Sequence, residues 1–102
     1  MKASRSHNEA MIEMLRRDPA FAATYLRTAL EEINVPGGET AFLAALRQVA
    51  QAQGGITRVA KVAKMKREAV SRALSARGNP TLKTLATLYR ALTPAPKSKR
   101  MA

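Results

Sequence analysis

The stretch GGITRVAKVAKMKREAVSRALSARGNPTL, residues 54–82, decides the fold of this chain. Within it, residues 56–63 predict a helix of only about two turns, which is too short to be stable unless it packs on its neighbours. A second short helix is predicted from Arg67 to Ser75, because Val70 and Leu74 lie four residues apart and face inward together. Two short helices separated by a tight turn are the elements of a helix-turn-helix.

The outer face of the second short helix carries polar and charged side chains. A helix of this kind fits the major groove of DNA, which is about 12 Å wide, and side chains near its N-terminal end read the base edges. Arg67 and Arg72 can each donate two hydrogen bonds to a guanine, whereas Ser71 is a shorter and less selective reader. Glu68 either accepts from a cytosine or has a structural role at the positive end of the helix. The predicted base-reading residues are Lys66, Arg67, Glu68, Ser71 and Arg72.

Groups that can bind phosphate flank this helix on both sides. Backbone N–H groups at the start of the first short helix and polar side chains after the second are placed to contact the DNA backbone. Lysines around the unit add an attraction that depends on salt but not on sequence. The predicted phosphate-contacting residues are Gly55, Ile56, Thr57, Lys61, Lys64, Ser75, Arg77, Asn79 and Lys83.

The charge of the chain is distributed unevenly. The formal net charge is +11, yet residues 1–53 contain as many acidic as basic side chains. Residues 54–102 contain Glu68 as their only acidic residue among many lysines and arginines. Such an excess favours a polyanionic partner, with nucleic acid as the first choice. The alternative is a solvated basic face that only keeps the protein soluble.

Helical patterns also cover the N-terminal third of the chain. Ser6 and Glu9 have the spacing of a capping box, which predicts that a helix starts at Ser6 and runs to about Arg17. Asp18 and Pro19 suit the N-cap and the first position of a second helix. The sequence Val35-Pro36-Gly37-Gly38 ends that helix and offers a joint to the rest of the chain.

The remaining apolar positions predict a third helix from Glu39 and a last helix from Thr81. No stretch of useful length alternates with a period of two, so no strands are expected. The predicted fold is an all-α, helix-turn-helix bundle of five to six short helices. We expect an N-terminal helical arm at 1–36, the helix-turn-helix domain at 37–92, and a basic, disordered tail at 93–102.

Several functional classes find no support in the sequence. The chain has no cysteine and a single histidine, His7, so neither a metal site nor a catalytic triad is expected. It also lacks clustered carboxylates and a phosphate-binding glycine loop, so we expect no enzyme and no cofactor. No signal peptide or membrane-spanning run is apparent, which indicates a cytoplasmic protein without membrane contact. Sequence-specific RNA binding is disfavoured because only 4% of the residues are aromatic.

The segments 54–60, 67–74 and 78–82 resemble the core of a known family, the HigA-like antidote proteins (antitoxins) of addiction modules. This family has the lambda-repressor-like (XRE-type) helix-turn-helix. The resemblance extends upstream through residues 17–21 and 42–47, so it covers roughly residues 17–92.

The resemblance implies an antitoxin that neutralises a RelE-like ribonuclease toxin and represses their common promoter, usually as a homodimer on a double-stranded operator. The candidate toxin-binding residues are the apolar side chains of the N-terminal arm: Met11, Met14, Leu15, Phe21 and Tyr25. The alternative is that these side chains simply form part of the core. The alternative function is a stand-alone regulator of phage or plasmid type, with the same helix but no toxin.

The sequence departs from the family pattern at three places. Lys64 stands where the turn usually has glycine, so either the lysine takes the turn geometry or the turn shifts. Lys66 stands where serine usually caps the second short helix, so about 1 kcal/mol of capping is expected to be missing. The last helix is followed by Pro94-Ala95-Pro96 rather than by an apolar strand. A dimer formed through such a strand is therefore not expected.

Overall fold

The computed structural model describes the backbone of residues 2–75 and 77–94 and the side chains of residues 7–75 and 77–94. This part of the chain forms six helices and no strand, which confirms the predicted all-α bundle of short helices. The helices are α1 (Lys2–Arg17), α2 (Pro19–Glu31), α3 (Gly38–Ala52), α4 (Ile56–Ala63), α5 (Arg67–Ala73) and α6 (Leu82–Leu92). None of these helices is long and apolar enough to cross a bilayer. The predicted tail lies outside the described residues from position 95 onward.

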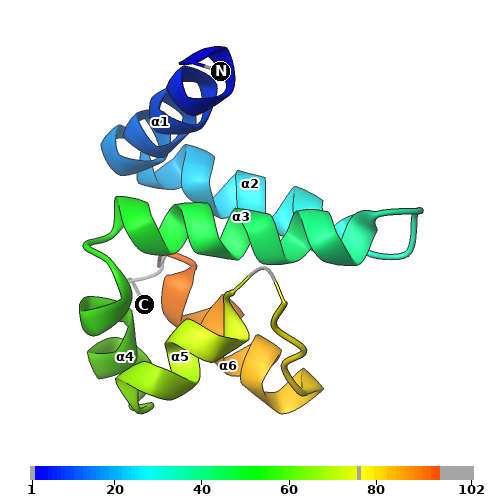
Figure 1. Cartoon of the computed structure of the whole chain (residues 1–102), viewed down its shortest axis with the longest axis vertical. Coiled ribbons are helices and arrows are strands. Elements are labelled where there is room, and N and C mark those ends of the chain that lie inside the picture. Colours follow the sequence, from blue (N-terminus) through cyan, green and yellow to red (C-terminus); the bar gives the residue numbers. More distant parts are fainter. Residues whose placement is uncertain (1, 76, 95–102) are drawn as a thin grey trace, which may run out of the picture.

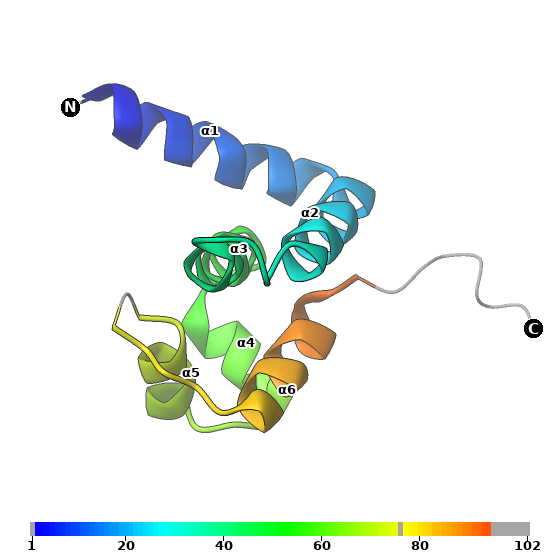
Figure 2. The same ribbon diagram turned by 90° about the vertical axis from the view of Figure 1, so that its right-hand side faces the viewer.

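Helix α3 lies in the middle of the molecule. Helices α1 and α2 lie on one side of it, and α4, α5 and α6 lie on the other (Figures 1 and 2). Almost half of the residues in α3 are buried: Gly38, Phe42, Ala45, Leu46, Val49, Ala50 and Ala52. The short helices α4 and α5 therefore rest on a support that is itself covered by the N-terminal helices.

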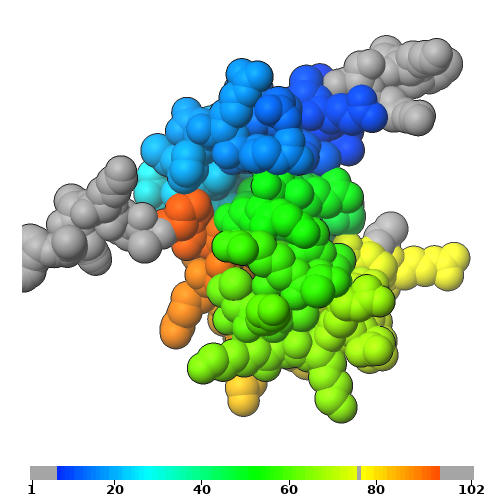
Figure 3. Space-filling model, turned by 90° about the vertical axis from the view of Figure 1, so that its left-hand side faces the viewer, coloured from blue at the N-terminus to red at the C-terminus, as the bar shows by residue number. Residues whose placement is uncertain are grey.

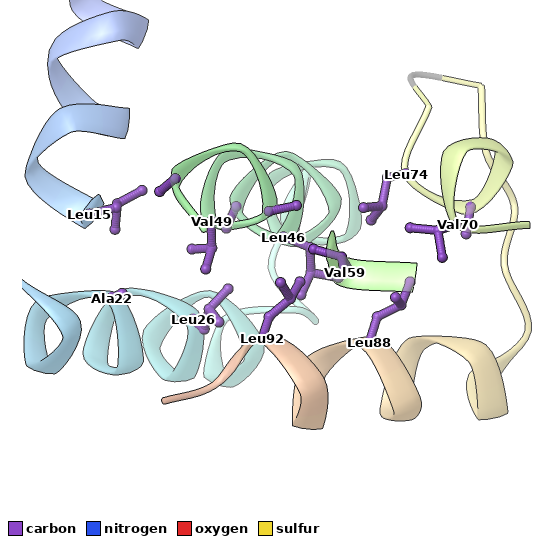
Figure 4. Close-up of a cluster of buried hydrophobic side chains, with 14 of the residues drawn as sticks. Leu15, Ala22, Leu26, Leu46, Val49, Val59, Val70, Leu74, Leu88 and Leu92 are labelled. Carbon is purple, nitrogen blue, oxygen red and sulfur yellow. The ribbon is translucent and has the colours of Figure 1, made fainter. Parts of the chain in front are cut away.

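One cluster of buried apolar side chains runs through the bundle (Figure 4). It includes Leu15 and Leu26 from the N-terminal helices, Leu46 from α3, Val70 from α5 and Leu88 from α6. Each of these is at most 3% exposed, and burying a side chain of this size contributes about 1.5–3 kcal/mol. Packing into this cluster supplies the stability that helices as short as α4 and α5 lack by themselves.

Two of the helix starts are fixed by a capping side chain. Asp18 caps α2 by accepting a hydrogen bond of 3.0 Å from the Phe21 backbone N–H, as predicted. Thr81 caps α6 in the same way through the N–H of Thr84. The predicted start of α1 was wrong, because the helix begins at Lys2 rather than at Ser6. The residues between them include neither glycine nor proline, so nothing there stops a helix.

The turn between α2 and α3 depends on both of its glycines. Gly37 takes the left-handed conformation with φ of 80°. Gly38 is buried, and a Cβ atom there would collide with the carbonyl oxygens of Glu32 and Ile33. The glycine pair thus allows the start of α3 to pack directly against the end of α2.

Candidate nucleic-acid interface

Helices α4 and α5 are joined by Lys64, Met65 and Lys66. Lys64 takes the left-handed conformation, with φ of 58° and ψ of 45°, and its backbone N–H caps the end of α4. The N–H of Met65 donates to the carbonyl oxygen of Ala60 over 3.0 Å, which closes the turn. The sequence left open whether Lys64 takes the turn geometry or the turn shifts. The structure shows that Lys64 takes the left-handed geometry of the usual glycine.

Replacing Lys64 by glycine should stabilise the protein. A left-handed conformation costs a residue with a Cβ roughly 1–2 kcal/mol, and glycine adopts it freely but loses some entropy on folding. We expect Lys64→Gly to raise the free energy of unfolding by about 1 kcal/mol, measured by urea denaturation. Lys64→Ala is the matched control, because it removes the charge but keeps the strain. Equal stability of the two variants would contradict this assignment.

Helix α5 begins without a side-chain cap. Lys66 is the N-cap residue with extended backbone angles, and within the described residues it forms no side-chain capping hydrogen bond. The expected loss of a cap is therefore confirmed. Packing of Val70 and Ala73 on the opposite face holds the helix instead, since both are buried.

The outer face of α5 carries Arg67, Glu68, Ser71, Arg72 and, just after the helix, Ser75, and we call these residues the α5 face. All five are exposed, and together with Ile56 of α4 they line one shallow hollow of about 350 Å³. The yellow-green side chains of this region project from the end of the molecule opposite α1 (Figure 3). The structure thus brings four of the five predicted base readers together, while Lys66 precedes them as the exposed N-cap.

The predicted phosphate-contacting residues are less uniformly placed. Gly55 and Ile56 at the start of α4 are half-buried. The Ser75 hydroxyl donates to the carbonyl oxygen of Arg72 over 3.0 Å, so its proton is engaged within the protein rather than available to a phosphate. Lys83 does not line the α5 hollow but a separate groove with Arg90, between α4 and α6. The others are exposed: Thr57, Lys61, Lys64, Arg77 and Asn79.

Positive charge on the α5 face is not neutralised by nearby carboxylates. Among the side chains of residues 7–75 and 77–94, the ion pairs within 4.0 Å join Glu13 to Arg16 and Arg17, on α1. Arg67 and Arg72 have no such partner in that part of the chain, and Glu68 does not pair with either of them. Their guanidinium groups can therefore donate to an external acceptor.

The apolar residues predicted for toxin binding differ in exposure. Leu15 is 3% exposed and belongs to the core, so it is not part of the surface. Met11, Phe21 and Tyr25 are half-buried, and only Met14 is well exposed, at 50%. The Phe21 and Tyr25 rings lie with their centroids 5.9 Å apart.

A chain of polar contacts joins these N-terminal helices to α3. The Tyr25 hydroxyl donates to Gln48 Oε1 over 2.6 Å, and Gln48 Nε2 donates to Asn8 Oδ1 over 2.9 Å. A tyrosine hydroxyl is protonated at neutral pH, and burial raises the pKa of the Tyr25 hydroxyl further, so this group is the donor. The side chain of Gln48 thereby ties α1 and α2 to the central helix.

The sequence reasoning missed two residues that hold helix ends. Arg47 Nε donates to the carbonyl oxygen of Leu74 at the end of α5, over 2.9 Å. Gln53 Nε2 donates to the carbonyl oxygen of Leu92 at the end of α6, over 2.8 Å. No local pattern reveals such contacts, because the paired residues lie 27 and 39 positions apart.

Comparison with known proteins identifies the family. A family model described as "Probable addiction module antidote protein" matches residues 7–99, which is nearly the whole chain. No curated protein and no solved structure matches the sequence. The match includes all six helices apart from the first residues of α1, and it agrees with the expectation of an addiction module antidote protein. The chain therefore belongs to the family of addiction module antidote proteins.

Proposed function

We propose that α4 and α5 form a lambda-repressor-like helix-turn-helix, and that the protein is a sequence-specific DNA-binding antitoxin that represses its own promoter. One observation carries the DNA-binding part of the proposal. Arg67 and Arg72 are both exposed and line a common hollow, on a helix whose opposite face is buried in the core. A rigidly held helix with two free guanidinium groups suits the major groove.

In the proposed complex, the α5 face enters the groove with its N-terminal end toward the bases. Arg67 and Arg72 donate to guanine edges, and Ser71 and Glu68 contact neighbouring bases. Lys61, Lys64 and Arg77 bind phosphates on either side, which fixes the register of the helix. A homodimer would read two half-sites separated by about 34 Å, one helical turn of DNA.

Membership of an antidote family implies a toxin as a second partner. We propose that this is a RelE-like ribonuclease and that it contacts α1 and α2, where Met14 is exposed. This face is remote from the α5 face, because α1 and α5 lie on opposite sides of α3 (Figure 1). The two partners therefore need not compete for one surface.

Footprinting on the DNA upstream of the gene tests the proposal. Purified protein should protect a site there in preference to random DNA, and the product of the neighbouring gene should bind the protein and change the protection. Protection without any binding to that product would favour the stand-alone regulator. Failure to distinguish this DNA from random sequence would refute sequence-specific repression.

Changing Met14 to lysine should weaken toxin binding without affecting DNA binding. An exposed methionine on a contact surface loses its apolar contacts, and the new charge is desolvated in the complex, so we expect at least a roughly tenfold increase in the toxin Kd. Isothermal titration calorimetry with the neighbouring gene product measures it. Gln51→Lys, at an exposed position of α3 outside the proposed toxin-binding helices, adds the same charge as a control. Equal effects of the two variants would show that only charge matters.

A further inference from the structure

Arg47 connects the central helix to the end of the helix that we propose to read DNA. Its Nε donates to the carbonyl oxygen of Leu74, which is the C-cap residue of α5. The last carbonyl groups of a helix lack partners within the helix. In Figure 1, the C-terminal end of α5 is turned toward α3. The hydrogen bond of Arg47 joins these two helices.

The carbonyl end of α5 is held by contacts from several directions. The Arg72 carbonyl oxygen accepts from the Ser75 hydroxyl. Gly78 packs so closely that a Cβ atom there would lie 2.6 Å from the Arg72 oxygen and 2.5 Å from the Ala73 oxygen. Arg47 is the one charged side chain among these contacts, and it comes from a helix outside the α4–α5 unit.

The Leu74 contact leaves most of the Arg47 guanidinium unused. A guanidinium has five N–H donors, and the bond to Leu74 takes the one on Nε. Arg47 is only half-buried, and in the described part of the chain no carboxylate lies within 4.0 Å of it. The two terminal amino groups form a planar fork that matches the oxygens of a phosphate. The bond to Leu74 places the Arg47 guanidinium at the C-terminal end of α5. Ser75 and Arg77, which are predicted to contact the DNA backbone, follow the same end of this helix in the chain.

We propose that Arg47 is a positioning residue for DNA recognition, with Nε anchored on the end of α5 and its terminal amino groups bound to one backbone phosphate. This inference rests on the proposed function, because it requires α5 to lie in the groove. The anchored guanidinium would fix the distance between the phosphate and α5, and hence the depth at which Arg67 and Arg72 meet the bases. Arg47 therefore acts on sequence selectivity without touching a base.

The test compares Arg47→Met and Arg47→Lys with the wild type in fluorescence anisotropy, using the operator, a single-mismatch operator and random DNA over a range of salt concentrations. Arg47→Met should weaken operator binding about tenfold and lower the slope of log K against log salt by about one. Arg47→Lys should keep that slope, because the charge remains, but should reduce discrimination against the mismatch several-fold. The control is Arg27→Met, which removes the same charge from an exposed position of α2. This variant should leave the salt slope and the discrimination against the mismatch unchanged.

The outcomes separate the inference from the proposed function. A wild-type protein that does not prefer its operator would remove the proposed function, and the inference with it. A selective wild type with Arg47 variants of unchanged slope and unchanged selectivity would overturn the inference alone and leave Arg47 as a simple helix cap. Circular dichroism shows whether each variant folds. If Arg47→Met does not fold, the discrimination of Arg47→Lys against the mismatched operator tests the inference. Reduced discrimination supports it, and unchanged discrimination overturns it.

Discussion

Replacing Arg67 and Arg72 together by alanine should abolish the preference of the protein for its operator. Each bidentate contact to a guanine contributes roughly 1–3 kcal/mol of discrimination, so losing both corresponds to about 2–6 kcal/mol. The two side chains line one hollow, so their effects are expected to be coupled rather than strictly additive. Both residues are exposed, so the double variant should keep its free energy of unfolding within about 1 kcal/mol.

Gel-shift titrations on operator and random DNA measure this effect, and each single variant should relax selectivity at a different base pair. The control is the double variant Arg16→Ala, Arg27→Ala, which removes two exposed arginines from α1 and α2. It should weaken binding slightly and equally on both DNAs. If the Arg67, Arg72 variant loses affinity equally on operator and random DNA, the two arginines contact phosphates and the base-reading assignment fails.

Replacing Leu26 by alanine should destabilise the whole bundle, including the helices on the far side of α3. Leu26 is 0% exposed and belongs to the same cluster as Leu46, Leu88 and Val70. Truncation of a fully buried leucine leaves a cavity and costs about 2–5 kcal/mol. A chain of this length has a small total stability, so a loss of this size is a large part of it.

Urea denaturation followed by circular dichroism should give a single transition that is shifted to lower urea. Leu82→Ala is the matched control, because Leu82 is 82% exposed and the same truncation there should cost less than about 0.5 kcal/mol. Two separate transitions, with only the first one shifted, would instead mean that the N-terminal helices unfold independently of α4 and α5. DNA binding would then be expected to survive the loss of α1 and α2.

The helix pattern and the character of α5 could be predicted from the sequence. Asp18 and Pro19 indicate the start of α2 because a cap acts on the next few backbone N–H groups. Val70 and Leu74 are buried as their spacing predicts, and Ser71 and Arg72 between them are exposed. These features depend on contacts within about one helical turn, and the sequence determines such contacts directly.

What the tertiary structure alone decided is how distant segments meet. Leu15 has the same apolar character as Met14, yet packing against α2 and α3 buries the first and leaves the second exposed. Arg47 and Gln48 are neighbours on α3, but one holds the end of α5 and the other binds Tyr25 and Asn8. The crossing of helices sets these partners, and crossing depends on the packing of side chains from all six helices at once. No local pattern in the sequence contains that information.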